Sequence, residues 1–156
     1  MTVPFWPVLE REFARSTTGC RIFADEESAL AWVAALRVEQ DAVGVTWASA
    51  LIAETGSVVL CGNDGQRRSD SLLCRHHLAL VRCRDIHRDL ASFLATLPGE
   101  RLHQVVGSHL TLITGPSRTA DIEKVLVIPA HGPAQLTVVI VDDATLAPCA
   151  ADCRSG

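Results

Sequence analysis

One segment in the second half of the chain combines several groups suited to binding an anion. It reads Ile113-Thr114-Gly115-Pro116-Ser117-Arg118-Thr119-Ala120-Asp121-Ile122-Glu123. We predict a strand that ends at Gly115-Pro116 and a helix over residues 119–125. Unpaired backbone N–H groups, two hydroxyls and a guanidinium would then surround one point. A helix start of this kind attracts carboxylate or phosphate, and a guanidinium can hold either one bidentately.

A purely structural interpretation of the same segment stays open. In that interpretation Ser117 or Thr119 only caps the helix, because a hydroxyl at the N-cap satisfies a free backbone N–H. Arg118 then pairs with Asp121 or Glu123 instead of with a ligand. The spacing alone does not separate the two interpretations.

Two further polar residues stand where a site could form. Glu54, in Ala53-Glu54-Thr55-Gly56, lies between apolar stretches at the entry to a buried strand. A partly buried carboxylate must be paired or shifted in pKa, so Glu54 is either a network member, with Arg118 as candidate partner, or an acid, base or nucleophile. His131, in His131-Gly132-Pro133, either reaches a site or holds a turn. His76 and His77 are adjacent on a strand, so at most one faces inward.

Other kinds of site are not indicated. The sequence has no Gly-rich phosphate loop, GxSxG elbow, HExxH or paired-carboxylate motif. Its six cysteines form no CxxC pair, and the closest two are Cys149 and Cys153. We therefore expect free thiols in a reducing compartment and neither a metal site nor a cofactor bound by this chain.

Length and charge narrow the class of protein. The 156 residues fit one domain spanning 1–156, with a loose tail over 144–156. The net charge of −4 and the scattered basic residues argue against nucleic-acid binding. Apolar runs are far shorter than the ~20 residues of a membrane span, and the first residues lack the pattern of a signal peptide. We expect a cytoplasmic protein that binds no membrane.

The elements that position these groups alternate between strand and helix. We predict helices over 8–15, over 26–39 after the N-cap Asp25, over 86–97 after the cap Asp85, and over 119–125. Strands are expected at 20–24, 57–60, 77–83, 109–114 and 135–141. This order predicts an α/β fold with an open, mostly parallel sheet and flanking helices. Ligands bind beyond the carboxyl ends of such strands, which directs attention to the residues after Leu60, Val81 and Thr114.

These stretches, taken in order, resemble the LUD domain of the lactate-utilization protein C family (LutC, YkgG-like). The resemblance covers roughly residues 44–143. The long string ending at Glu123 is its most specific part, and the other matching stretches are Ile52-Ala53-Glu54-Thr55-Gly56, Gly65-Gln66 with Arg68, Ser71-Leu72-Leu73, His77-Leu78-Ala79 and His131-Gly132-Pro133.

The resemblance implies a fold like that of ribose-phosphate isomerases and CoA transferases (NagB/RpiA/CoA-transferase-like). It also implies a role in bacterial oxidation of L-lactate to pyruvate, beside an iron–sulfur subunit, which would hold the cluster, and a second redox subunit. The candidate catalytic residue is Glu54. The candidate ligand-binding residues are Glu54, Thr55, Gln66, Arg68, Gly115, Ser117, Arg118, Thr119, Asp121, Glu123 and His131.

The sequence departs from the family pattern in three places. The part before residue 44 is shorter than usual, so a strand–helix unit is expected to be missing there. Trp47 and Ser49 replace an expected Gly and an acidic residue, and Cys74-Arg75 replace an expected Pro-Pro.

Three functions remain open at this point. The first is an accessory subunit that binds a small anion or redox partners. The second is an enzyme of acyl-CoA or sugar-phosphate type that uses Glu54 with Arg118 as anchor. The third is a truncated interaction module whose open sheet edge is covered by a partner or by a second copy in a homodimer.

Overall fold

A four-stranded parallel sheet forms the centre of the fold. The computed structural model describes residues 3–39, 42–62, 71–97, 109–116, 119–120, 126–127 and 132–142. The order in this sheet, called sheet A, is β1-β10-β5-β2, and every pair is parallel. Its strands are β1 (Gly19–Phe23), β2 (Val43–Trp47), β5 (His76–Arg82) and β10 (Gln135–Val141).

The two central strands of sheet A are buried along almost their whole length. The side chains of β5 from His77 to Val81 are all buried, and so are those of β10 from Val138 to Val141. Strands covered on both faces are nearly continuous apolar runs of this kind. The parallel sheet predicted from these runs is confirmed.

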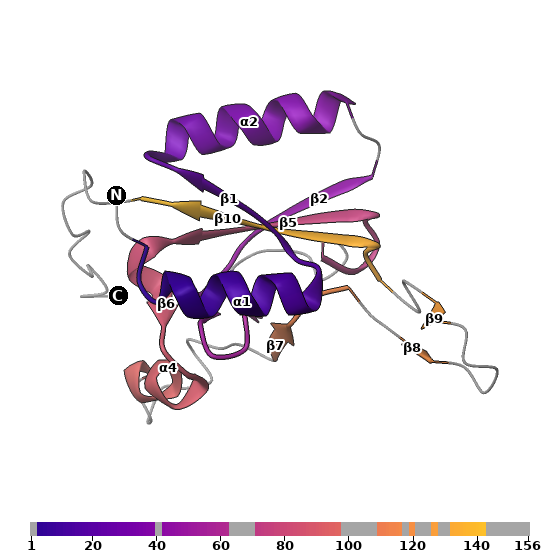
Figure 1. Ribbon diagram of the computed structural model, residues 1–156. Helices are drawn as coiled ribbons and strands as arrows, with labels where there is room; N and C mark the ends of the chain where they lie inside the picture. The colour runs from indigo at the N-terminus through magenta and orange to yellow at the C-terminus, as the bar shows by residue number, and fades with distance from the viewer. Residues whose placement is uncertain are drawn as a thin grey trace, which may run out of the picture.

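A different helix covers each face of sheet A. On one face, α2 (Glu26–Glu39) packs Ala29 and Val33 against Leu78 and Leu80 of β5. On the opposite face, α1 (Trp6–Ser16) contributes side chains to a core cluster that includes other residues of β5 and β10. Figure 1 shows the two helices on opposite sides of the sheet. The flanking helices were therefore predicted correctly.

A second sheet, called sheet B, packs on the α1 side. Its order is β6-β3-β4-β7. It consists of β3 (Ala50–Ile52), β4 (Ser57–Cys61), β6 (Ile86–His87) and β7 (Leu110–Ile113). Pairs β3–β4 and β4–β7 are antiparallel, whereas β3–β6 is parallel. Leu51 and Val58 of sheet B join the same core cluster as Ala79 and Val138 of sheet A. The helix α4 (Leu90–Thr96) covers sheet B by burying Phe93.

The helix predicted over residues 86–97 is wrong at its beginning. Residues Cys83–Asp85 form a single turn of 3-10 helix, and Ile86–His87 form β6, which pairs with β3. The helix starts only at Leu90. Its N-cap is Asp89, whose carboxylate accepts a hydrogen bond of 2.7 Å from the backbone N–H of Ser92. Ile86 is buried against sheet B, and this tertiary contact outweighs the helical spacing that includes it.

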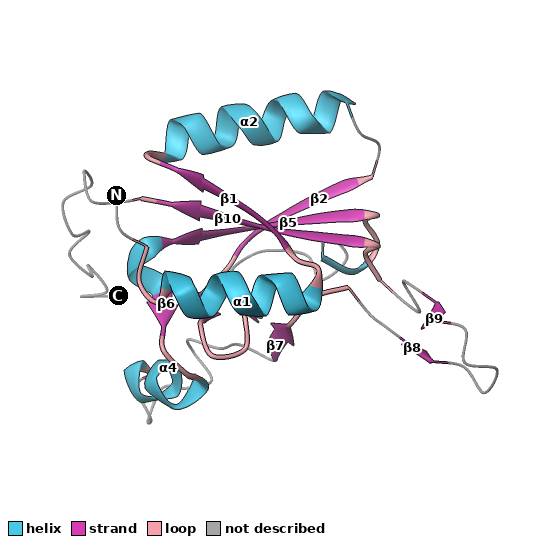
Figure 2. Ribbon diagram, in the orientation of Figure 1, coloured by secondary structure: helices cyan, strands magenta, loops and turns pink. Residues whose placement is uncertain are grey.

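The helix predicted over residues 119–125 is also wrong where the structure can test it. Residues Thr119–Ala120 form β8, which pairs antiparallel with β9 (Leu126–Val127). This pair lies to one side of the two sheets (Figure 2). Short apolar runs fit a strand or a helix equally well. The anion site expected at a helix start therefore has no helix at 119–120; residues 121–125 lie outside the described residues.

Two general features bear on function. None of the helices in the described ranges has both the length and the apolar character to cross a bilayer. Across the same ranges, no three His, Cys, Asp or Glu side chains are grouped so that they could hold a metal ion. Cys20, Cys61, Cys74 and Cys83 form no disulfide within the described residues, while Cys149 and Cys153 lie outside them.

Candidate functional site

The Glu54-Thr55-Gly56 stretch forms the turn between β3 and β4. The backbone N–H of Glu54 donates to the carbonyl of Arg88 at 3.0 Å, and its side chain is exposed. We expected a partly buried carboxylate, and this expectation is wrong because the turn directs the side chain into water. Solvent satisfies an exposed carboxylate, so burial gives Glu54 no reason to act as an acid or base.

A chain of three hydroxyls connects this turn to the Thr-Gly-Pro-Ser segment. Thr55 Oγ1 lies 2.7 Å from Ser57 Oγ, and Ser57 Oγ lies 2.8 Å from Thr114 Oγ1. Ser57, whose hydroxyl is the middle one of the three, is buried. Two stretches that are far apart in the sequence are thus joined directly before Gly115.

Gly115 is held in a conformation that requires glycine. Its φ is +144°, and a Cβ there would lie 3.0 Å from both the Cβ and the carbonyl oxygen of Ser16. The end of α1 therefore lies directly against the backbone of Gly115. Side chains rarely tolerate this φ, and the close approach excludes one independently.

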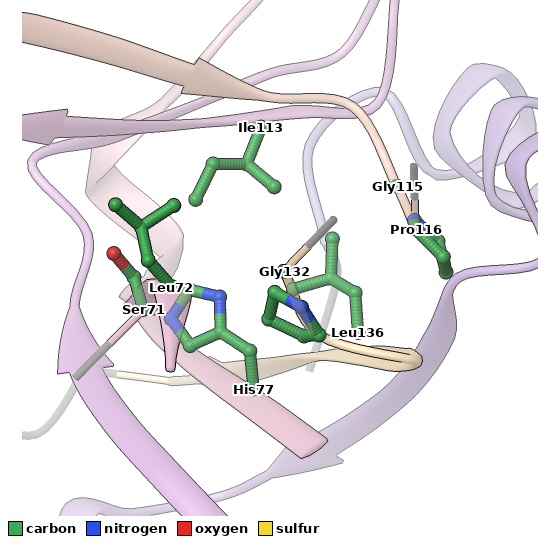
Figure 3. A pocket seen from close by; sticks show the side chains of 9 residues that line it. Ser71, Leu72, His77, Ile113, Gly115, Pro116, Gly132 and Leu136 are labelled. Carbon is green, nitrogen blue, oxygen red and sulfur yellow. The ribbon is translucent and has the colours of Figure 1, made fainter. Parts of the chain in front are cut away.

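A pocket of about 200 Å³ lies beside Gly115 (Figure 3). Four of the stretches that were singled out in the sequence meet at its walls: Ser71-Leu72, His77, Gly115-Pro116 and Gly132-Pro133. Ile113 and Leu136 also line it. The walls are mainly apolar, and the imidazole of His77 points into the space between them.

His77 is the buried polar side chain of this pocket. It is 1% exposed, and its Nε2 lies 2.8 Å from Thr46 Oγ1 on the neighbouring strand β2. Its Nδ1 is buried and has no hydrogen-bond partner within the described part of the chain. Burial, and secondarily the nearby His76, lowers the pKa of His77 from 6.5 to about 4. The ring is therefore neutral near pH 7.

His76 lies on the other face of sheet A. Its Nε2 lies 2.8 Å from Thr137 Oγ1 on β10, and its side chain is only partly buried. Leu78, two residues further on the same face, packs against α2. The prediction that at most one of the two histidines faces inward is confirmed.

A second and larger cavity, of about 350 Å³, lies beyond the carboxyl ends of β2, β4 and β5. This is the position predicted for residues after Leu60 and Val81. Its polar groups contact one another: Arg84 Nε lies 3.9 Å from Asp85 Oδ1, and the N–H of Cys61 donates to Ser49 Oγ at 3.3 Å. Of the candidate ligand-binding residues within the described ranges, Glu54, Thr55 and Gly115 do not line this cavity.

The predicted site residues lie in different parts of the chain's structure, and only some of them belong to the smaller pocket. Gly115 lines the smaller pocket, and Thr55 is linked to it through Ser57. Thr119 is placed in β8 by its backbone, and Glu54 faces solvent. The remaining candidates lie outside the described residues: Gln66, Arg68, Ser117, Arg118, Asp121, Glu123 and His131. His77 and Ser71 are pocket residues that the sequence did not single out as ligand-binding; the signal for His77 was a histidine within a buried strand.

Comparisons with known proteins identify the family of this chain and agree with its observed fold. Residues 34–141 match the sequence model of the LUD domain. Lactate utilization protein C of Halalkalibacterium halodurans is 37% identical over 114 residues, which are 69% of this chain and 47% of that protein. Lactate utilization protein C of Shouchella clausii is 35% identical over 106 residues, 65% of this chain and 44% of that protein.

Two further similarities extend this finding. The uncharacterized protein YkgG of Escherichia coli is 35% identical over 113 residues, 69% of this chain and 47% of that protein. The chain thus spans about half the length of the curated relatives that it matches. A crystal structure of a DUF162 family protein from Deinococcus radiodurans has a TM-score of 0.65 and 18% identity, and covers 88% of this chain and 96% of that one. This last similarity shows the fold.

Proposed function

Since this chain belongs to the LUD domain family, we propose that it serves in lactate utilization by binding a small organic acid in the pocket around His77. The observation that carries the proposal is the convergence of separated stretches. Three separate regions of the sequence line one pocket: residues 71–77, which supply Ser71, Leu72 and His77, then Gly115-Pro116, and then Gly132-Pro133.

The dimensions and walls of the pocket support a small ligand. Its volume of about 200 Å³ is below the roughly 300–1,000 Å³ of sites for drug-sized molecules. Leu72, Ile113 and Leu136 offer apolar surface to an alkyl group. A short acid with a methyl or ethyl group has a suitable shape and size.

The carboxylate of such an acid requires a compensating charge, because an unpaired ion in an apolar pocket is strongly unfavourable. Arg118 follows Pro116 by two residues, and Pro116 lines the pocket. We propose that the Arg118 guanidinium pairs with the carboxylate and that the Ser117 hydroxyl donates to it. A bidentate arginine–carboxylate pair provides both charge and orientation.

We further propose that the chain works as an accessory subunit beside iron–sulfur and redox subunits of a lactate-utilization system. The support is the family itself: proteins named lactate utilization protein C are 34–37% identical to this chain. Affinity purification from a bacterium grown on lactate tests this part. Recovery of an iron–sulfur protein in stoichiometric amount is expected, and recovery of the chain alone would contradict it.

Calorimetric titration tests ligand binding directly. L-lactate is expected to bind, and Arg118→Ala is expected to weaken binding at least tenfold through loss of the charged pair. Arg21→Ala is the matched control, because Arg21 is an exposed arginine on β1, away from the pocket lining. Equal loss in both variants, or no binding of lactate or pyruvate at millimolar concentration, would contradict the proposal.

A further inference from the structure

We infer that Nδ1 of His77 is the point at which this pocket recognises its ligand, and that the ligand presents a hydroxyl group to it. The inference rests on the proposed function and narrows the organic acid to one that carries a hydroxyl group. The alkyl group of the ligand would lie on the apolar walls and its hydroxyl on the imidazole. His77 is thereby a specificity-determining residue.

Nδ1 of His77 requires a hydrogen-bond partner. It is buried and has no hydrogen-bond partner within the described residues, while Nε2 of the same ring is engaged by Thr46. A buried polar atom left without a partner costs about 1–3 kcal/mol. The lining residues Ile113, Leu72 and Leu136 are apolar and give Nδ1 no partner. Ser71, which also lines the pocket, already has a polar interaction of its own.

The charge of the His77 ring bears on which group of the ligand it binds. His77 stays neutral near pH 7, because burial and the neighbouring His76 lower its pKa to about 4. A neutral imidazole supplies no positive charge to offset an ionised carboxylate, and Arg118 is the proposed partner of that group. A neutral hydrogen-bonding group of the ligand therefore fits Nδ1 better than the ionised end does.

Among neutral groups of a ligand, a hydroxyl is the best partner for Nδ1 of His77. A neutral imidazole carries one N–H and one acceptor nitrogen. Thr46 Oγ1 can either donate to Nε2 or accept from it, so both tautomers of His77 satisfy that contact. A hydroxyl also donates and accepts, and it can pair with Nδ1 in either tautomer. A carbonyl oxygen only accepts, so it pairs with Nδ1 in one tautomer alone.

Two substitutions separate the ring nitrogens. The side-chain amide of glutamine is as many bonds from Cβ as Nε2, and that of asparagine as many as Nδ1. His77→Gln can keep the contact with Thr46 but loses the group at the Nδ1 position. His77→Asn keeps a polar group at the Nδ1 position. His76→Gln is the control, since it makes the same change on the opposite face of β5.

The test compares L-lactate with propionate, which lacks only the hydroxyl, by titration of each variant after its folding has been checked by circular dichroism. The wild type is expected to bind lactate at least tenfold more tightly than propionate, because a site built for a hydroxyl rejects an analogue without one. His77→Gln should bind both equally, whereas His77→Asn and His76→Gln should keep the preference. Equal wild-type affinities, or pyruvate binding as tightly as lactate, would overturn the inference.

Nitrogen NMR of ¹⁵N-labelled histidine gives a readout that does not depend on the carboxylate. The probe is 2-propanol, which has the methyl and hydroxyl groups of lactate without its charge. A shift of the Nδ1 resonance with 2-propanol, together with no binding of any acid, would support the hydroxyl site and refute the organic-acid proposal. Binding of lactate without a change at Nδ1 would refute the hydroxyl site and leave the organic-acid proposal standing. No change at Nδ1 with either probe would refute the hydroxyl site.

Discussion

The hydroxyl of Ser57 lies 2.8 Å from that of Thr114, although the two residues are 57 positions apart in the sequence. Ser57 follows the Glu-Thr-Gly turn, and Thr114 precedes Gly115 at the wall of the pocket. The bond fixes the end of β7 relative to β4, with which it pairs. Residues of the Glu-Thr-Gly turn thereby support the pocket without lining it.

Removing this link should destabilise the protein. Ser57→Ala breaks the bonds to both Thr55 and Thr114, and Ser57 is buried, so a loss of about 1–3 kcal/mol in the free energy of unfolding is expected. Thr55→Ala is the matched control. It breaks only the bond to Ser57 from an exposed side chain, and a smaller loss is expected. Urea denaturation measures both, and equal losses would argue against a structural role for the Ser57–Thr114 bond.

Gly115 and Gly132 allow backbone strain to be separated from steric conflict. Both have positive φ, +144° and +79° respectively, so alanine is strained at either position. Among the described residues, a Cβ at Gly132 would meet only the carbonyl of Leu72 at 3.9 Å, but one at Gly115 would come within 3.0 Å of Ser16. Gly132→Ala should therefore cost about 1 kcal/mol, and Gly115→Ala clearly more. Denaturation midpoints decide this, and a smaller loss for Gly115→Ala would contradict the close contact with α1.

His77 should make the stability of the protein depend on pH. Its pKa is about 4 in the folded chain and 6.5 in its ordinary state. As the pH falls below about 6.5, the unfolded chain takes up a proton that the folded chain accepts only near pH 4. The contribution is therefore fully present above pH 6.5 and is lost as the pH falls to 4, by an amount on the order of 3 kcal/mol.

Unfolding free energies of the wild type and His77→Gln, measured from pH 7 to pH 4, test this dependence. The wild type should lose more stability over this interval than the variant. His76→Gln keeps His77 and should retain most of the loss. If the curves of the wild type and His77→Gln run parallel, His77 is not the group responsible.

The start of α4 can be tested by comparing two aspartates. Asp89→Ala removes the carboxylate that accepts from the N–H of Ser92, and loss of an N-cap costs about 1 kcal/mol. Asp85→Ala should cost less, because Asp85 lies within the preceding 3-10 turn and is not the N-cap of α4. Thermal unfolding of both variants provides the measurement. A larger loss of stability for Asp85→Ala would contradict the assignment of Asp89 as the N-cap of α4.

Parts of the fold followed from local sequence. The apolar runs of β5 and β10 indicated a parallel core, and Asp25 was correctly expected to cap α2, where it accepts from the Ser28 N–H at 2.7 Å. These predictions succeeded because the deciding interactions lie within a few residues or depend only on apolar content.

Other features depend on contacts between distant residues. Ile86 fits a helical spacing, but it lies in strand β6 and pairs with Leu51 of β3. Glu54 stands between apolar stretches, and yet its turn exposes it. Among the described residues, Nδ1 of His77 lacks a partner because Thr46, on another strand, engages the opposite nitrogen. No local pattern carries this information.

Chemical-shift mapping of the protein during titration with L-lactate shows directly whether the ligand binds in the pocket around His77. The changes are expected at the residues that line the smaller pocket, namely Ser71, Leu72, His77, Ile113, Gly115, Gly132 and Leu136. Changes confined to the second cavity, at Ser49, Arg84 and His87, would place the ligand elsewhere and contradict the account. The complete absence of changes would contradict it as well.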